Sequence, residues 1–199
     1  MDGVACYYDI QHFHEKFSVY TCCLYKKEIS HGSTFSGQHL ADHTDDDVRG
    51  VALSHCNFSG FPRDLLESFP NLDHISINGG LTEITKTDLA GYVNLKFLDL
   101  QGCELTRLPS DLFDKTPNLE VIYFSHNKIS SIGENLLEPL EKIKYVDFKG
   151  NPKISSVFDI DKSELFSLDD MKREIRDISG ENNEIVERKE DSFRVLGSK

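Results

Sequence analysis

Two pairs of histidines and a run of acidic residues near the amino terminus are the side chains whose types could bind a metal ion. His12 and His14 are one residue apart, His39 and His43 are separated by three residues, and Asp45–Asp47 are contiguous. Imidazole nitrogens and carboxylate oxygens are the usual ligands of zinc and calcium. Side chains of contiguous residues diverge, however, so the acidic run does not converge on one ion. We therefore expect a solvated surface here, with no metal site and no cofactor.

Signatures of catalysis are missing from the sequence. It has no glycine-rich phosphate loop, no Ser/His/Asp signature and no CxxC motif. We therefore expect a protein that is not an enzyme. A sequon at Asn57-Phe58-Ser59 predicts glycosylation of Asn57 in a secreted protein. Because Phe58 falls on a buried position of the repeat described below, glycosylation requires that Asn57 be exposed at the turn.

Composition excludes several classes of partner. The 199 residues suit one domain with a sizeable core. Acidic residues outnumber basic ones by 34 to 22, and the net charge of −12 repels phosphate backbones, so we expect no nucleic-acid partner. No apolar run approaches the roughly 18 residues of a membrane span, so we expect no membrane association. The first residues do not resemble a signal peptide, which leaves a cytosolic chain and a chain whose signal has been removed as alternatives.

An internal repeat organises more than half of the chain. Apolar residues recur in the pattern LxxLxLxxN/CxL, and the five units start at Val48, Leu72, Leu95, Leu119 and Ile143. Each unit is 23 or 24 residues long, a spacing that chance does not reproduce five times in phase. This pattern resembles the leucine-rich repeat of the extracellular type. The resemblance implies a non-enzymatic module that recognises other molecules.

The spacing itself predicts a fold of the α/β class. The apolar residues of each LxxLxL segment alternate with period two, as a strand with one buried face requires, and equal repeats stack these strands in parallel. A single unit cannot bury its own apolar face, so the array needs neighbours and a cap at each end. We expect a leucine-rich repeat solenoid shaped as a short horseshoe, with the parallel sheet on its concave face. Its parts are an amino-terminal cap over residues 1–47, five repeats over 48–158, and a carboxyl-terminal helical cap and tail over 159–199.

The five cysteines fall into two groups. Cys56 and Cys103 occupy the Asn/Cys position of the repeat, where cysteine is a small buried residue, and two coils separate them by roughly 10 Å, too far for a disulfide. We expect both to be free. In the cap, two strand-like segments place Cys6 and Cys22 as the natural bridge, which leaves Cys23 as an outward-facing free thiol or an intermolecular disulfide. Pairing of Cys6 with Cys23 is the alternative.

A narrower resemblance concerns the amino-terminal segment. An early Cys, the segment Tyr20-Thr21-Cys22, and Asp45–Asp47 before the first repeat are similar to the amino-terminal cap of secreted insect leucine-rich repeat proteins. That resemblance implies an oxidising, extracellular compartment, where such a bridge persists. It also suggests a role in insect innate immunity or secretion.

The concave face is the surface on which the sequence predicts binding. Residues between the buried positions of each strand point outward, and aromatic and charged ones gather toward the carboxyl-terminal repeats. We expect the ligand-binding residues to be Phe97, Asp99, Gln101, Val121, Tyr123, Ser125, Tyr145 and Asp147. The alternative is that the segment after residue 159 folds over them. That segment carries Leu165, Leu168, Met171, Ile175 and Ile178 at helical spacing, after a capping Ser167.

These observations lead to one main hypothesis and two alternatives. We expect a secreted module that binds a protein ligand on its concave face. A structural or assembly protein that forms homo-oligomers through Cys23, the caps or the tail is the first alternative. An intracellular adaptor or regulator with all five cysteines reduced is the second, and a native bridge between Cys6 and Cys22 would argue against it.

Overall fold

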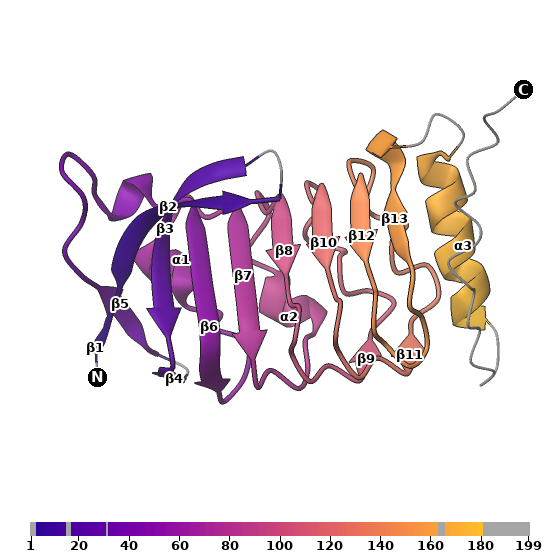
Figure 1. The fold of residues 1–199 in the computed structure, drawn as a ribbon, viewed down its shortest axis with the longest axis horizontal. Helices are drawn as coiled ribbons and strands as arrows, with labels where there is room; N and C mark the ends of the chain where they lie inside the picture. The colour runs from indigo at the N-terminus through magenta and orange to yellow at the C-terminus, as the bar shows by residue number, and fades with distance from the viewer. Residues whose placement is uncertain (1–2, 15–16, 31, 163–165, 181–199) are drawn as a thin grey trace, which may run out of the picture.

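The computed structural model describes residues 3–14, 17–30, 32–162 and 166–180. Its main feature is one curved sheet in which eight strands follow one another in sequence order (Figure 1). The strands lie in the order β13-β12-β10-β8-β7-β6-β3-β2, and β4 also pairs with β6. The bounds of the repeat strands are β6 (Gly50–Phe58), β7 (His74–Gly79), β8 (Phe97–Asp99), β10 (Val121–Tyr123) and β12 (Tyr145–Asp147).

The repeat strands are parallel, and equivalent positions of successive repeats lie side by side. The register joins Val51 to Ile75, Ile75 to Leu98, Leu98 to Ile122, and Ile122 to Val146. All five side chains are fully buried in one continuous core. The apolar period of the sequence therefore does position the strands, and the predicted leucine-rich repeat fold is present.

Two asparagines hold the coils together through their side-chain amides. Asn127 donates from Nδ2 to the carbonyls of Leu100 and Phe124 at 2.8 and 2.9 Å, and its Oδ1 accepts from the Leu105 amide at 3.0 Å. Asn151 makes the equivalent bonds one coil later. An amide group that both donates and accepts suits this position, because backbone groups of two coils need partners there. Cys103 takes the same position in its coil and donates from Sγ to the Ile77 carbonyl at 3.3 Å.

Short elements cover the convex side of the coils. They are α1 (Leu65–Ser68), α2 (Lys86–Leu89), and the two-stranded parallel sheet of β9 (Arg107–Leu108) and β11 (Ser131–Ile132). Buried aromatic rings fill the space beneath them, with Phe113 and Phe124 centred 6.3 Å apart. The short elements and aromatic rings of the convex side therefore shield the core from solvent.

The amino-terminal segment extends the sheet at the edge of the first repeat. Its strands are β1 (Gly3–Ala5), β2 (Tyr7–Phe13), β3 (Phe17–Tyr25), β4 (Glu28–Ile29) and β5 (Thr34–Ser36), followed by a 3-10 helix over Asp45–Asp47. β2 and β3 form an antiparallel hairpin, and β3 pairs in parallel with β6. A disulfide joins Cys6 to Cys22, whose Cα atoms are 5.5 Å apart. The predicted bridge is confirmed, and the alternative pairing with Cys23 is wrong.

The carboxyl-terminal end reverses the direction of the chain. β13 (Val157–Asp159) pairs antiparallel with β12, and a 3-10 helix over Ile160–Lys162 follows it. The predicted helix is present as α3 (Leu168–Gly180), which buries Met171, Ile175 and Ile178. Ser167 caps its start, because its hydroxyl accepts a bond from the Asp170 amide at 3.2 Å. Leu165 and the predicted tail over residues 181–199 lie outside the described residues. No helix among the residues that the structure describes is long and apolar enough to cross a membrane.

Candidate functional site

The parallel register brings the predicted binding residues into two adjacent rows. Phe97, Val121 and Tyr145 are direct neighbours in one row, and Asp99, Tyr123 and Asp147 are neighbours in the next. Gln101 and Ser125 lie beyond them, and the Ser125 hydroxyl donates to Gln101 Oε1 at 3.2 Å. The structure therefore brings all eight predicted residues to one end of the concave face.

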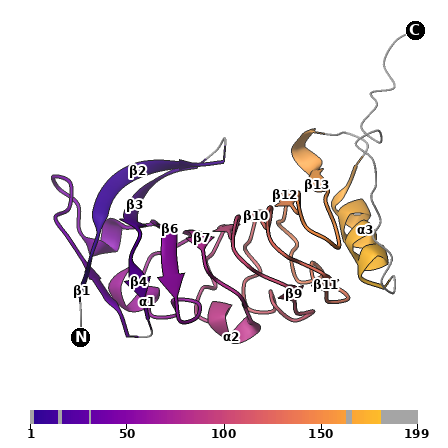
Figure 2. The same ribbon diagram turned by 60° about the horizontal axis from the view of Figure 1, so that its bottom comes forward.

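Three of these residues are not open to a ligand, and for them the expected exposure is wrong. Phe97, Val121 and Ser125 are only 2%, 3% and 2% exposed. The hairpin of β2 and β3 arches over the concave face (Figure 2), and the Phe13 ring centre lies 5.1 Å from that of Phe97. The cover over Phe97 and Val121 comes from the amino-terminal segment, whereas the alternative considered above placed it after residue 159.

Tyr123 and Tyr145 remain half-buried beside the hairpin. Their ring centres are 5.0 Å apart, and the Tyr123 hydroxyl lies 2.7 Å from Nδ1 of His14. Burial raises the pKa of Tyr123, and the neighbouring Tyr145, Asp147 and Asp99 raise it further. Burial and Asp147 also raise the pKa of Tyr145. Both phenols are therefore neutral hydrogen-bonding groups at any physiological pH.

Two carboxylates flank Tyr123 along its row. Asp99 accepts hydrogen bonds from the Ser76 hydroxyl at 2.8 Å and from the Gln101 amide at 2.9 Å. Burial raises the pKa of Asp99 above its ordinary value, and the negative charge of Asp147 adds to this effect, although the two hydrogen bonds oppose it. Two like charges beside aromatic rings favour a ligand that brings a positive charge or hydrogen-bond donors.

A small hollow separates the hairpin from the carboxyl-terminal end of the sheet. Its volume is about 220 Å³, and it lies between His14 and Phe17 on one side and Asp159 and Asp161 on the other. Tyr145 is part of its lining. Tyr123, Asp99 and Asp147 lie in the neighbouring row of the sheet, outside the lining of this hollow, and the exposed Gln101 lies beyond them.

A row of alternating charges borders the sheet where its strands begin. Arg49, Asp73, Lys96, Glu120 and Lys144 each directly precede a repeat strand. Asp73 pairs with Arg49 and lies 3.9 Å from Lys96, and Lys144 donates to Glu120 at 2.8 Å. The common spacing of these residues was available in the sequence as a signal, but sequence analysis did not use it.

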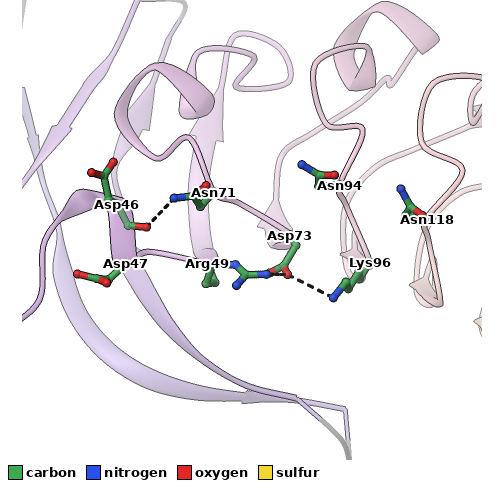
Figure 3. Close-up of a pocket in the computed structure, with 8 residues that line it drawn as sticks. All are labelled: Asp46, Asp47, Arg49, Asn71, Asp73, Asn94, Lys96 and Asn118. Atoms are coloured by element: carbon green, nitrogen blue, oxygen red, sulfur yellow. Dashed lines mark hydrogen bonds and ion pairs between the residues drawn. The ribbon is translucent and has the colours of Figure 1, made fainter.

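The first three charges of this row border a polar hollow of about 540 Å³ (Figure 3). Burial acts to raise the pKa of Asp73, but the hydrogen bond and charge of His74 and the charge of Arg49 outweigh it and hold that pKa below its ordinary value. Asp73 is therefore a negative charge that pairs with Arg49 and His74 and lies near Lys96. The Asn94 and Asn118 side chains also line this hollow, on the side of Asp73 away from Asp46 and Asp47.

The remaining predicted residues have the following places. Cys56 and Cys103 are buried free thiols, and Cys23 is a half-buried free thiol whose pKa is raised to about 11 by burial and by Asp9. Asn57 is exposed, and its Nδ2 donates to Glu28 Oε1 at 2.5 Å. Among the described residues, no group of three or more metal-binding side chains is placed to hold an ion.

Comparisons with known proteins agree with the fold. Residues 93–152 match the leucine-rich repeat family model. Rabbit fibromodulin (Oryctolagus cuniculus) is 26% identical over 109 residues, which cover 55% of this chain and 72% of fibromodulin. The human leucine-rich repeat-containing G-protein coupled receptor 5 is 29% identical over 90 residues, 45% of this chain but only 10% of the receptor.

Solved structures match the chain at a lower level of sequence identity. The Drosophila Toll–Spätzle complex matches 58% of this chain and 16% of its own chain, at 20% identity and a TM-score of 0.49. The chain spans only about a tenth of the receptors that it matches. A leucine-rich repeat protein of the extracellular type is supported by three findings together. These are the family match over residues 93–152, the parallel sheet and the similarity to fibromodulin.

Proposed function

We propose that this protein is a secreted, non-enzymatic recognition module that binds a protein ligand on the open part of its concave face. The observation that carries the proposal is the position of Tyr123 and Tyr145, half-exposed between Asp99, Asp147 and Asp159 on a hydrogen-bonded sheet. Aromatic side chains on a rigid strand contribute large contact areas at a low cost in conformational entropy. Charged groups beside them select the partner.

Two further observations support the compartment and the class of ligand. The disulfide between Cys6 and Cys22 suits an oxidising environment and argues against a cytosolic adaptor. The net charge of −12 favours a protein ligand with basic groups over a nucleic acid. Exposure of Asn57 is compatible with glycosylation of its sequon in such a compartment.

A role in insect innate immunity is the narrower form of this proposal. It rests on the likeness of the amino-terminal segment to secreted insect proteins. The relatives named above that are at least 25% identical over the matched residues are vertebrate proteins. The likeness to Toll is too low to support or oppose the immune role.

The proposal is tested by screening the disulfide-bonded protein against a panel of secreted proteins from its source organism. The same screen is run with a variant carrying Asp99→Asn, Asp147→Asn and Tyr123→Ala. A convex-side variant, Arg107→Ala, is the matched control, because Arg107 is exposed on β9. Partners captured by the wild type and the control, but lost with the concave variant, would support the proposal. Equal capture by all three proteins would contradict it.

Self-association is a second candidate function, which the edge strand β2 favours. Tyr7 and Ile10 on this strand are 67% and 46% exposed, and β2 ends the order of the main sheet. An edge strand with apolar side chains can pair with a second copy. A disulfide through Cys23 is a less suitable route, because a pKa of about 11 keeps this thiol protonated. Sedimentation velocity of the wild type and of Ile10→Lys distinguishes the two functions: a dimer that Ile10→Lys abolishes would favour assembly.

A further inference from the structure

The hairpin of β2 and β3 continues well beyond the sheet that anchors it. β3 pairs with β6 only from Thr21 to Tyr25, whereas β2 and β3 pair with each other as far as Phe13 and Phe17. The far part of the hairpin is therefore a two-stranded ribbon that lies above the concave face (Figure 2). Such a ribbon is only marginally stable alone, so its position depends on the surface beneath it.

The surface beneath the ribbon is an apolar cluster separate from the main core. Phe13 packs with Phe97 and Val121, and Phe17 and Tyr123 adjoin them. The main core is a different and much larger cluster. Removing the ribbon would therefore expose Phe97 and Val121 without opening the core that holds the repeats.

One polar atom under the ribbon has no partner. His74 is 2% exposed, and its Nδ1 lies 2.6 Å from Asp73 Oδ1. Its Nε2 is buried and makes no hydrogen bond within the described part of the chain. The rings of Phe13 and Phe17 are centred 5.5 and 4.9 Å from the His74 ring. Because a buried nitrogen without a partner is unfavourable, displacement of the ribbon would let Nε2 bind water or a ligand.

Gly50 permits the close approach of the ribbon. A Cβ atom there would lie 2.5 Å from Thr21 Oγ1, 2.9 Å from Val19 Cγ2 and 3.2 Å from Phe13 Cε2. Even a methyl group at this position would push the base of the ribbon away from β6. The closed position therefore depends on a glycine as well as on the aromatic contacts.

We propose that the far end of the hairpin is a displaceable cover over a second ligand site, formed by His74, Phe97 and Val121. This site fits an aromatic side chain that carries a hydroxyl or N–H group, such as tyrosine. The ring would replace Phe13 against Phe97, and the polar group would bond to Nε2 of His74. The inference goes beyond the proposed function, because the cover and its site can be tested without any protein ligand.

Chemical modification of His74 by diethylpyrocarbonate measures whether the cover opens. The test variant is Phe13→Ser with Phe17→Ser, and the control is Ile10→Ser, an exposed residue of the same strand. His126, which is exposed, is the internal reference for reagent concentration. We expect His74 to react at least about tenfold faster in the test variant, while the thermal midpoint of the repeats shifts by only a few degrees. The control should react like the wild type. Continued protection of His74, or loss of cooperative folding in the test variant, would overturn the proposal.

Two measurements retain all the aromatic residues. Gly50→Ala should also accelerate modification of His74, because it lifts the ribbon. In the unaltered protein, amide exchange at residues 10–13 and 17–20 should be at least about tenfold faster than in β6 and β7, and independent of global unfolding. Equal exchange rates in the ribbon and in β7 would show that the hairpin is a fixed part of the core and would overturn the proposal.

The class of ligand is tested with para-cresol, the side chain of tyrosine, and with toluene, which lacks the hydroxyl. In the Phe13→Ser, Phe17→Ser variant, para-cresol should slow modification of His74 relative to His126, and toluene should slow it less. Equal effects of the two compounds, or no effect of either, would contradict recognition through Nε2 of His74.

Discussion

The hydroxyl of Tyr123 lies 2.7 Å from Nδ1 of His14, a residue 109 positions earlier in the chain. This contact joins the end of the amino-terminal hairpin to β10, which lies three strands beyond β6 in the sheet, across the concave face. It shows that the candidate binding face is built by two distant segments. The contact also determines how much of that face remains open.

The contact between His14 and Tyr123 should contribute measurably to stability. Tyr123→Phe removes the hydroxyl and keeps the ring, and a double-mutant cycle with His14→Ala isolates the pair. We expect a coupling of about 0.5–1.5 kcal/mol in urea denaturation, the usual contribution of one hydrogen bond. Tyr7→Phe is the control, because Tyr7 is largely exposed and its change should stay within about 0.5 kcal/mol. A coupling of zero would show that the bond does not hold the hairpin.

The disulfide should stabilise the amino-terminal end of the sheet. Cys6 and Cys22 are 16 residues apart, and a loop of this size corresponds to roughly 3 kcal/mol of stabilisation. We expect Cys6→Ser with Cys22→Ser to lose about 2–4 kcal/mol of unfolding free energy in urea. A reductant should bring the wild type to the same value and leave the double variant unchanged. If the reductant leaves the stability of the wild type unchanged, even under conditions in which the folded and unfolded states interconvert freely, the result would argue against the bridge.

The amide of Asn127 should be far more important than that of an exposed asparagine. Asn127→Ala leaves the Leu105 amide and the Leu100 and Phe124 carbonyls without this partner in the core. Each unsatisfied buried group costs about 1–3 kcal/mol, so we expect a loss of at least that size. Asn94→Ala is the matched control, since Asn94 is exposed at the polar hollow and should change stability by less than about 0.5 kcal/mol. Equal effects in calorimetry would refute this role of the repeat asparagine.

Asp99 should reduce stability at neutral pH. Burial and Asp147 raise its folded-state pKa, so its contribution to stability is greatest below the ordinary value of about 3.9 and is lost as the pH rises through the raised pKa. Asp99→Asn should therefore increase the unfolding free energy at pH 7 and increase it less at pH 3. A change of equal size at both values would mean that the substitution acts through packing rather than through charge.

Asp73 should behave in the opposite way. Its folded-state pKa is lowered, so its stabilising contribution is present above the ordinary pKa and is lost as the pH falls through the lowered value. Asp73→Asn should destabilise the protein at pH 7, because Arg49 and His74 lose their charged partner. The penalty should shrink in urea denaturation at the lowest accessible pH. A penalty that grows on acidification would contradict this assignment.

Much of the architecture could be predicted from the sequence because it depends on local periodicity. The spacing of Leu98, Ile122 and Val146 dictates which side chains face the core, and equal spacing sets the strand register. The bridge from Cys6 to Cys22 followed from the segments that contain these two residues. The antiparallel pairing of β13 with β12 could not be predicted in this way, because no local pattern specifies the direction of the last strand.

The shape of the candidate site depended on contacts that sequence spacing does not encode. Phe13 and Phe17 lie on the same face of the hairpin. Which residues they cover depends on how the hairpin bends over strands that lie about 60 to 110 positions later in the sequence. The burial of Phe97 and Val121 is a consequence of this bend, because both pack with Phe13. Tyr123, Tyr145, Asp99 and Asp147 were placed together correctly because they depend on the repeat alone.

The most direct test of the central claim is the dissociation constant of a captured secreted partner, measured for the wild type, Tyr123→Ala and Arg107→Ala. Loss of a buried aromatic contact at the centre of an interface commonly costs 2 kcal/mol or more, so Tyr123→Ala should weaken binding by about 30-fold or more. Arg107→Ala should leave the constant unchanged, and Tyr123→Ala should still unfold cooperatively, with a thermal midpoint that is lower but well above the temperature of the binding measurement. Equal affinity of Tyr123→Ala and the wild type would show that the concave face is not the recognition surface.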